Sequence, residues 1–268
     1  MKAHFFERRL CLPGILLLSL LGFACRSSET EKPGGETAKE IIVSAAASLQ
    51  DVFREIGRQF ETRTGTRVSF NFGASGALQR QIESGAPVDV FASAGRPQMD
   101  ALASQGLITP ESRRDFTGNA LVLVVPADQA LELKSFADLG GAKVKRLAMG
   151  NPKTVPVGQY SEQSLTRLGL WQQLQSRVVL GEDVRQVLDY VARGEVEAGL
   201  VYASDVRAAD SRVRIVARAP ANSHDPIFYP IAVVWASRQP EASRSFIDAV
   251  MSDEGQRSLE KYGFERIQ

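Results

Sequence analysis

Short apolar runs alternate with amphipathic stretches from residue 40 almost to the C-terminus, and this alternation constrains the fold more than any other feature. An apolar run predicts a buried strand, and apolar residues on a helical repeat predict a helix with one face in a core. Expected helices include residues 158–168 and 184–192. Strand–helix alternation with short loops predicts an α/β fold with mainly parallel sheets. We expect strands at residues 40–46, 68–72, 88–92, 119–126, 146–150, 197–202 and 227–235.

The charge and the few cysteines and histidines limit the chemistry open to this chain. It has 32 basic and 31 acidic residues and a formal net charge of +1, which gives no electrostatic reason to expect a nucleic-acid partner. It has two cysteines and two histidines, of which Cys11, Cys25 and His4 lie near the N-terminus. We therefore expect no disulfide scaffold and no side chains that ligate a metal directly. A histidine base in the body of the chain could only be His224.

The first residues are typical of an export signal. Basic residues precede residues 10–24, an almost entirely apolar run that is too short for a membrane span of about 20 residues, so we expect a signal peptide over residues 1–24. Cys25 directly after a small residue resembles a bacterial lipobox, whereas Gly22 and Ala24 fit ordinary secretory cleavage. We favour lipidation of Cys25, because a free lone cysteine is a liability on an exported protein.

Residues 25–39 follow the signal and are polar after the cysteine, with glycine and proline but no large apolar side chain. Such a composition predicts a flexible tether. We expect an exported protein in the periplasm or at the outer face of the cytoplasmic membrane, with a lipid on Cys25 as its anchor.

Candidate ligand-binding residues lie where expected strands give way to helices. Ser48 and Ser75 precede two of these helices, and Val157 and Val184 lie at the start of two others. A helix N-terminus presents unpaired N–H groups and about half a positive charge. Ligands of open α/β sheets bind beyond the carboxyl ends of the strands. Several such helix starts, if they converge, form an anion site without any lysine.

Each of these residues also has an ordinary structural interpretation. Serine is a common helix N-cap, so Ser48 or Ser75 taken alone is better explained as a cap. Tyr202, at the end of an expected strand, is by default a core residue with a solvated hydroxyl. Asp183 is the expected cap of the helix that follows it, and an acid there is unfavourable to an anion nearby. The order of the motifs along the chain is what favours ligand binding.

Seven short motifs follow one another from residue 45 to residue 264. Together, and with their spacing, they resemble the periplasmic molybdate-binding proteins of ABC importers. The resemblance implies a type II periplasmic-binding-protein fold, in which two lobes, each a mixed and mostly parallel sheet flanked by helices, are joined by two crossover strands and close on a ligand. The motifs are Ala-Ala-Ala-Ser-Leu at 45–49, Phe-Gly-Ala-Ser-Gly at 72–76, Gly-Ala-Pro-Val-Asp-Val-Phe at 85–91, Val-Pro-Val-Gly at 155–158, Glu-Asp-Val-Arg at 182–185, Val-Tyr-Ala-Ser-Asp at 201–205 and Lys-Tyr-Gly-Phe at 261–264.

The resemblance also implies residue roles and lobe boundaries. It implies a first lobe of residues 40–119 plus 224–268 and a second of residues 120–223, with the strands at 119–126 and 227–235 as the crossovers. The second motif departs from the family pattern, because Gly73, Ala74 and Gly76 stand where serine-rich versions are familiar. We expect Gly76 to loosen this loop, which bears on affinity rather than on ligand class. The oxyanion would be bound by the hydroxyls of Ser48, Ser75 and Tyr202 and by the backbone N–H groups of Val157 and Val184.

The function implied is the capture of molybdate, with tungstate as a second ligand, for delivery to an ABC permease in the inner membrane. The resemblance implies a monomer that is not an enzyme and holds no cofactor. Uncharged donors suit a fully deprotonated dianion, since they offer no acceptor for the proton that phosphate keeps at neutral pH. An unpaired buried group costs about 1–3 kcal/mol. Sulfate has the same charge and shape as molybdate, so the size of the cavity must decide between them.

Two alternatives stay open on the sequence. The first is a two-lobed binding protein for another oxyanion such as sulfate, or for a small organic ligand, whose carboxylate usually takes an arginine clamp. Arg80 and Arg185 follow proposed contacts closely enough for that role. The second, more remote, is an exported serine hydrolase that uses Ser75 with His224 as its base. The sequence around Ser75 approximates Gly-x-Ser-x-Gly, but its second glycine is one place early.

Overall fold

The computed structural model describes residues 39–267 except residues 130 and 210. The expected signal peptide, the cysteine at position 25 and almost all of the expected tether lie outside the described residues, so these three expectations stay predictions. Within the described part, no helix is both long enough and apolar enough to cross a membrane.

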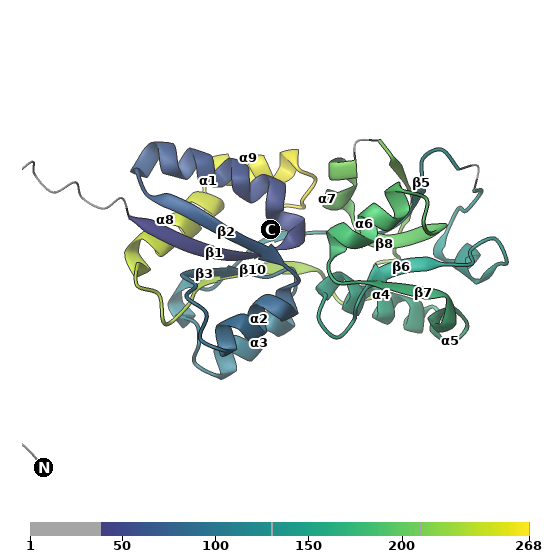
Figure 1. Cartoon of the computed structure of the whole chain (residues 1–268), viewed down its shortest axis with the longest axis horizontal. Coiled ribbons are helices and arrows are strands. Elements are labelled where there is room, and N and C mark those ends of the chain that lie inside the picture. The colour runs from purple at the N-terminus through teal and green to yellow at the C-terminus, as the bar shows by residue number, and fades with distance from the viewer. Residues whose placement is uncertain (1–38, 130, 210, 268) are drawn as a thin grey trace, which may run out of the picture. The chain divides into compact units, whose positions relative to one another are not determined.

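The first sheet has five strands in the order β2–β1–β3–β10–β4. Strand β10 is antiparallel to both of its neighbours, and the other four strands run in one direction. Helices α1, α8 and α9 lie on one face of this sheet and α2 and α3 on the other (Figure 1). We call this sheet with its helices the first lobe. Its elements are β1 Glu40–Ala46, α1 Gln50–Thr64, β2 Arg67–Gly73, α2 Ser75–Glu83, β3 Val90–Ala92, α3 Arg96–Ser104, β4 Arg114–Gly118, β10 Phe228–Val233, α8 Pro240–Met251 and α9 Asp253–Lys261.

The second sheet has the order β7–β6–β8–β5–β9 and repeats the same plan. Strand β5 is the reversed strand here, and the other four run in one direction. Helices α6 and α7 lie on one face and α4 and α5 on the other (Figure 1). This sheet with its helices is the second lobe. Its elements are β5 Leu121–Pro126, β6 Leu147–Gly150, α4 Pro156–Arg167, α5 Trp171–Leu174, β7 Val178–Gly181, α6 Val184–Ala192, β8 Ala198–Tyr202, α7 Ala203–Val206 and β9 Val213–Arg218.

These sheets confirm the predicted α/β class with two mixed, mostly parallel sheets. The chain passes from the first sheet to the second between β4 and β5, at residues 119–120, and returns between β9 and β10, at residues 219–227. The strands expected at 119–126 and 227–235 are thus β5 and β10, and each directly follows one of these passages. The exact division of the chain into lobes stays a proposal.

Three strands were not expected from the sequence, namely β4, β7 and β9. Each is the edge strand of its sheet, with a single neighbour. Edge strands are covered on fewer sides, and these three are only partly buried along their length. They therefore lack the continuous apolar run that identifies a central strand.

The amphipathic stripe of α1 shows how the sequence fixes the helices on the sheets. Its apolar residues face the first sheet and are buried, among them Phe53 and Phe60. The ring of Phe53 lies 5.8 Å from that of Phe116 in β4 and 5.9 Å from that of Phe246 in α8, centroid to centroid. Aromatic pairs at this spacing stabilise a core beyond their buried area. This packing holds the start of α1 at the carboxyl end of β1.

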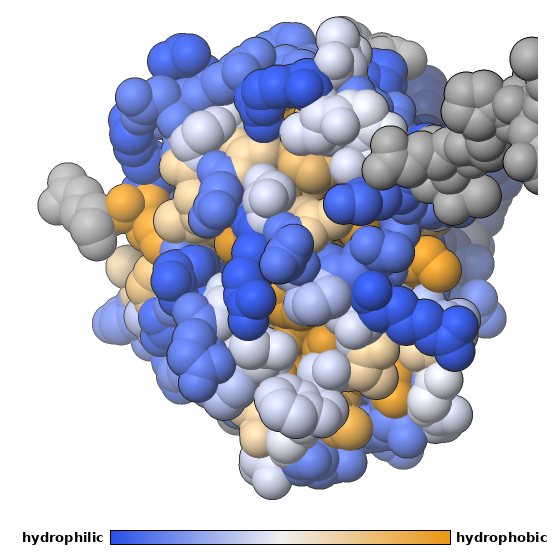
Figure 2. Space-filling view, turned by 90° about the vertical axis from the view of Figure 1, so that its left-hand side faces the viewer, coloured by the Kyte–Doolittle hydropathy of each residue, from blue (hydrophilic) through white to orange (hydrophobic). Residues whose placement is uncertain are grey.

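The surface of the first lobe is mixed. Figure 2 shows hydrophilic side chains over much of one face, with apolar side chains between them. The large apolar residues that are exposed in the described part of the chain lie on different helices, strands and loops. Scattered single residues of this kind are normal on folded proteins. They are Leu168, Leu180, Ile215, Trp235 and Met251.

Helix α4 begins in very close backbone contact with the end of β6. A Cβ atom added to Gly158 would lie 2.1 Å from the carbonyl oxygen of Gly150, which is closer than any real contact of that kind. Only glycine permits this approach, and the approach sets the position of Val157, the preceding residue. The glycine is therefore a structural requirement of the second lobe.

Replacement of Gly158 by alanine tests this requirement. We expect Gly158→Ala to lower the free energy of unfolding by about 1–3 kcal/mol, the usual cost of overpacking, as measured by urea denaturation. The matched control is Gly73→Ala, because a Cβ there would meet Leu78 at an ordinary 3.6 Å. Equal losses in the two variants would contradict the argument.

Candidate functional site

A small cavity of about 10 Å³, room for about one water molecule, lies between the carboxyl ends of strands from both sheets. All five residues predicted to bind an oxyanion line it. Ser48 and Ser75 come from the first lobe, whereas the other three come from the second. The structure thus brings together residues that are far apart in the sequence, and their role in binding stays a proposal. The five are Ser48, Ser75, Val157, Val184 and Tyr202.

The two serines are not helix caps. Ser48 lies in the short 3-10 turn Ala47–Leu49, and Ser75 is the first residue of α2. Neither α1 nor α2 has a side-chain hydrogen bond at its N-cap. The capping interpretation of both residues is therefore wrong, and their buried hydroxyls have other partners.

The hydroxyl of Ser75 is held in one orientation by the backbone of Ala94. Ser75 is fully buried, and its Oγ accepts a hydrogen bond from the Ala94 N–H at 3.0 Å. Because that bond uses a lone pair of Oγ, the hydroxyl proton is free for another partner. Ser75 is thus prepared to donate into the cavity.

The two valines contribute the N–H groups of helix starts. Val157 is in the first turn of α4 and Val184 in the first turn of α6. Neither N–H donates to any of the hydrogen bonds found in the described residues. Such groups point outward along the helix axis and carry the positive end of its dipole. Both N–H groups can therefore donate to a ligand in the cavity.

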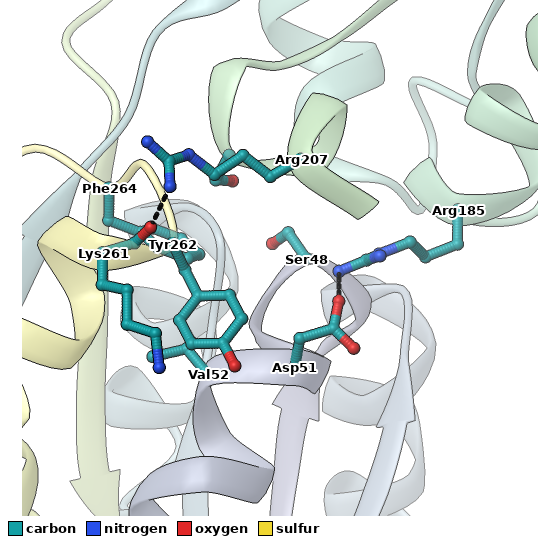
Figure 3. Close-up of a pocket in the computed structure, with 9 residues that line it drawn as sticks. Ser48, Asp51, Val52, Arg185, Arg207, Lys261, Tyr262 and Phe264 are labelled. Carbon is teal, nitrogen blue, oxygen red and sulfur yellow. Dashed lines mark hydrogen bonds and ion pairs between the residues drawn. The ribbon is translucent and has the colours of Figure 1, made fainter. Parts of the chain in front are cut away.

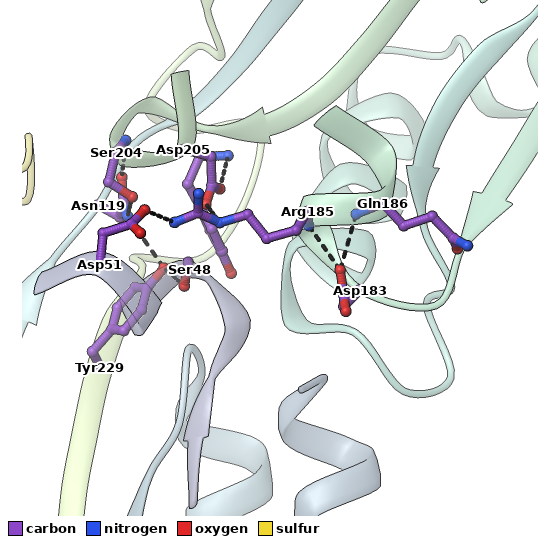
Figure 4. Close-up of polar contacts among 10 residues, drawn as sticks. Ser48, Asp51, Asn119, Asp183, Arg185, Gln186, Ser204, Asp205 and Tyr229 are labelled. Atoms are coloured by element: carbon purple, nitrogen blue, oxygen red, sulfur yellow. Dashed lines mark hydrogen bonds and ion pairs between the residues drawn. The ribbon is translucent and has the colours of Figure 1, made fainter. Parts of the chain in front are cut away.

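Asp183 caps α6, as the sequence predicted. Its carboxylate accepts hydrogen bonds from the N–H groups of Arg185 and Gln186 (Figure 4). The negative charge is therefore directed at its own helix, although the residue also lines the cavity. This pairing leaves the N–H of Val184 as the group of that helix start available to a ligand.

Tyr202 provides a hydroxyl from the end of β8. Its side chain is buried, and burial raises its pKa well above the ordinary value of a phenol, so the hydroxyl stays protonated at neutral pH. That hydroxyl donates to the Ala94 carbonyl at 3.1 Å. Ala94 is in the first lobe, so this bond joins the lobes beside the cavity. A ligand that accepts from Tyr202 must take the place of the Ala94 carbonyl.

The cavity lining described here contains no lysine and no arginine. The nearby cations line a larger pocket of about 530 Å³ that shares Ser48 with the cavity (Figure 3). Each of them has a partner, since Arg185 pairs with Asp51 at 2.8 Å, Lys261 pairs with Glu55 and Arg207 donates to the Lys261 carbonyl. Their charges are therefore largely used by the protein itself.

The arginine clamp that an organic acid would need is not assembled in the described structure. Arg185 is not among the residues that line the small cavity, and its guanidinium group pairs with Asp51 of the first lobe and Asp205 of the second (Figure 4). Arg80 is exposed on α2 and lines neither pocket. These placements do not favour a carboxylate ligand.

The pair of residues that a serine hydrolase needs is not assembled either. Ser75 Oγ bonds to the Ala94 N–H, whereas the ring of His224 bonds to the Asp225 carbonyl. No hydrogen bond joins Ser75 to His224 among the described residues. In the same part of the chain, no group of three or more histidine, cysteine, aspartate or glutamate side chains is arranged to hold a metal ion.

Three residues at the cavity were not expected from the sequence, namely Ala94, which lines it, and Asn119 and Tyr229, which do not. Ala94 bonds to two of the proposed ligand residues, and Asn119 and Tyr229 form hydrogen bonds next to Ser48. Ala94 acts through its backbone N–H and carbonyl groups, and nothing about an alanine in the sequence predicts such a role. Tyr229 lies inside the apolar run of β10, where it looks like any other core residue. Asn119, a polar residue just before the apolar strand β5, is the one that could have been noticed.

The fold defines an α/β protein with two lobes and a small cavity lined by residues of both. The sequence model of the bacterial extracellular solute-binding protein family matches residues 41–265. This chain belongs to that family.

Individual relatives agree with the assignment. The chain is 38% identical over 249 residues to YvgL of Bacillus subtilis, whose name proposes an ABC transporter substrate-binding lipoprotein; the match covers 92% of this chain and 95% of YvgL. It is 34% identical over 253 residues to the molybdate-binding protein ModA of Haemophilus influenzae, with 93% and 95% covered. The structure matches the periplasmic molybdate-binding protein of Azotobacter vinelandii with a TM-score of 0.78 at 26% identity, over 85% of this chain and 100% of that one.

Gly76 does not loosen the loop of the second motif, contrary to the expectation, because it is buried and bonded to the second lobe. Its N–H donates to the Thr154 carbonyl of the second lobe at 2.9 Å, and a Cβ on Gly76 would lie 2.6 Å from that oxygen. The backbones of the two lobes therefore approach at Gly76 as closely as a glycine allows. Any side chain there would hold them apart.

Replacement of Gly76 by alanine is expected to weaken ligand binding by about tenfold or more, because the contact between the lobes would be overpacked by about 1–3 kcal/mol. Titration calorimetry measures the affinity, and small-angle scattering reports whether the lobes separate. Gly57→Ala is the control, because the added Cβ would also be crowded, at 2.8 Å from the ring of Phe70, but inside the first lobe and outside the cavity lining. Unchanged affinity in Gly76→Ala would refute the role of this contact.

Asp205 makes stability depend on pH. The side chain is fully buried, and this burial raises its pKa to about 7, although Arg185 and the backbone N–H of Tyr202 act in the opposite direction. The ordinary value is 3.8. The folded protein thus binds a proton at a pH where the unfolded chain has already lost it. This contribution to stability is present at low pH and is lost as the pH rises toward 7.

Asp205→Asn removes the titrating group and tests the effect. We expect the melting temperature of the variant, relative to the native protein, to increase as the pH is raised from 5 to 8. The native protein loses the contribution of the protonated carboxyl over that interval, and the amide does not titrate. A difference in melting temperature that is constant across the interval would contradict the raised pKa.

Proposed function

We propose that this protein is the substrate-binding component of an ABC importer and captures molybdate, with tungstate as a second ligand, between its two lobes. The proposal rests on one main observation. Five uncharged donors from both lobes converge on one cavity, and its described lining has no lysine or arginine. The relatives from H. influenzae and A. vinelandii that bear the name of molybdate-binding proteins support the choice of ligand.

The chemistry of the donors matches a fully deprotonated dianion. Hydroxyl groups and backbone N–H groups can each donate to an anionic oxygen, and hydrogen bonds to charged groups are stronger than neutral ones. The starts of α4 and α6 add the partial positive charges of two helices. None of the five proposed contacts is a carboxylate or carbonyl that could accept a proton from the ligand, and the Asp183 carboxylate in the lining accepts from the N–H groups of its own helix. This donor set disfavours hydrogen phosphate.

The proposal includes the wider role of the protein. After export the chain would deliver its ligand to a permease in the inner membrane, as a monomer held at the membrane by a lipid on Cys25. It would act by binding alone, without catalysis or a cofactor. Its lobes would be residues 40–119 plus 224–268 and residues 120–223, a division supported by the two passages of the chain between the sheets.

Titration calorimetry of the purified chain against molybdate, tungstate, sulfate and phosphate tests the proposal. We expect heat with molybdate and tungstate, much weaker binding of sulfate, and little or none of phosphate. The absence of binding to molybdate, or equal affinity for sulfate, would reject the proposed ligand.

Ser75→Ala tests the site itself. Loss of one hydrogen bond to a charged oxygen costs about 1.5–3 kcal/mol, so we expect affinity for molybdate to fall by roughly 10- to 100-fold. Ser243→Ala is the matched control, because Ser243 is also fully buried but lies in α8 and bonds to the Gln239 carbonyl. Equal affinities in the two variants would remove Ser75 from the site.

A further inference from the structure

An ion pair between Arg185 of α6 and Asp51 of α1 joins the two lobes. The Arg185 Nη2 and Asp51 Oδ2 atoms lie 2.8 Å apart (Figure 3), and the side chains are 21% and 37% exposed. A second pair of this kind, between Arg218 of β9 and Glu265 beyond α9, has side chains that are 63% and 46% exposed. Exposed ion pairs contribute little. The pair formed by Arg185 is therefore the stronger of the two contacts.

This pair links two helix starts that carry proposed ligand contacts. Asp51 is in the first turn of α1, just after Ser48, and Arg185 directly follows Val184 at the start of α6. Helix α6 also contacts the turn Ala47–Leu49. A cation in the first turn of a helix is unfavourable, because the positive end of the dipole lies there. The position of Arg185 thus stabilises the contact between the lobes rather than its own helix.

A second carboxylate holds the Arg185 guanidinium group from within its own lobe. Asp205 is fully buried, its Oδ1 lies 3.6 Å from Arg185 Nε, and its Oδ2 accepts from the Tyr202 N–H at 3.1 Å (Figure 4). A separation of 3.6 Å is too long for a hydrogen bond. In the described structure neither Nε nor Oδ1 has another partner, although both atoms are buried. A short movement of the guanidinium group toward Asp205 would therefore complete a missing bond.

A tetrahedral oxyanion can enter or leave the cavity only when the lobes move apart. The cavity has room for about one water molecule and is lined from both lobes, whereas the ligand has four oxygens around its central atom. While the ligand passes, Ser48 and Val184 are farther apart, and so are Asp51 and Arg185 beside them. Asp205 stays with Arg185, because both belong to the second lobe.

We propose that Arg185 is a two-position latch, bonded to Asp51 when the lobes are together and to Asp205 when they are apart, and that competition between the two carboxylates sets how fast the oxyanion is released. The identity of the oxyanion rests on the proposed function, whereas the movement of the latch does not. Without Asp205, separation of the lobes would leave the guanidinium group without a carboxylate. With Asp205, the arginine has a partner in both arrangements.

Changes at the two carboxylates are expected to act in opposite directions. At pH 8 Asp205, whose pKa is raised to about 7 by burial, is charged. Asp51→Asn removes the partner of the joined lobes and is expected to make the release of molybdate about three- to tenfold faster. Asp205→Asn removes the competing partner and is expected to make release about two- to fivefold slower. Dissociation of bound radiolabelled molybdate into an excess of unlabelled molybdate measures both rates.

The pH profile of release gives a second readout. Protonation of Asp205 below pH 7 removes the competing charge, so we expect the native protein to release molybdate more slowly at pH 6 than at pH 8. Asp205→Asn is expected to lose this difference. The two tyrosines near Asp205 stay protonated over this range, because burial raises the pKa of each. The charged or titratable groups around Asp205 are Arg185, Asp183, Asp51, Tyr202 and Tyr229.

Glu265→Gln is the matched control, since it removes the first-lobe carboxylate of the exposed pair with Arg218. It is expected to leave the rate of release unchanged. In an Arg185→Gln background, neither Asp51→Asn nor Asp205→Asn is expected to change the rate further, because both act through the arginine. Faster release from Asp51→Asn and from Asp205→Asn alike would show that the cluster only supports the fold, and would overturn the inference.

A native protein that does not bind molybdate would reject the proposed function and leave the latch open to its own test. Small-angle scattering of the protein without ligand is then the measurement. We expect Asp51→Asn to be more extended than the native protein at pH 8 and Asp205→Asn to be no more extended than it. The same expansion in both variants would overturn the inference.

Discussion

An anion that leaves water needs a hydrogen-bond donor for each of its oxygens. The two sheets meet where their strands end and present such donors. Each sheet ends its parallel strands at the side of the cavity, where helices begin and N–H groups lack partners. The starts of α4 and α6 supply such groups through Val157 and Val184. Because the backbone supplies them, the positive end of a helix replaces a cationic side chain. Lysine and arginine line the neighbouring pocket, where Arg185 and Lys261 pair with carboxylates and Arg207 donates to a carbonyl.

The contacts between the lobes involve the same donor groups and hold them in place. Ala94 orients Ser75 with its N–H and receives the proton of Tyr202 with its carbonyl, so one backbone unit of the first lobe organises a hydroxyl from each side. Gly76 lets the backbones meet at Thr154. Asp51 of the first lobe pairs with Arg185 of the second. Binding and the contact of the lobes are therefore coupled through shared atoms rather than through distant elements.

Much of this architecture could be predicted from the sequence, because its signals are local. Buried strands such as β1 and β5 appear as apolar runs, and the stripe of α1 appears as a helical repeat. The edge strands β4, β7 and β9 were missed, because partial burial leaves no such run. The five candidate residues that line the cavity were predicted from short motifs at helix starts and from the order of these motifs along the chain. Ala94 and Tyr229 were not, because each acts through a contact with a residue far away in the chain, which no local pattern records.

The central claim is that uncharged donors from both lobes surround a doubly negative tetrahedral anion. The anomalous scattering of molybdenum in a crystal of the complex locates the ligand directly. The account predicts one molybdenum atom in the small cavity, with oxygens at hydrogen-bond distance from Ser48, Ser75, Val157, Val184 and Tyr202. Molybdenum found instead in the larger pocket, beside the guanidinium groups of Arg185 or Arg207, would contradict it.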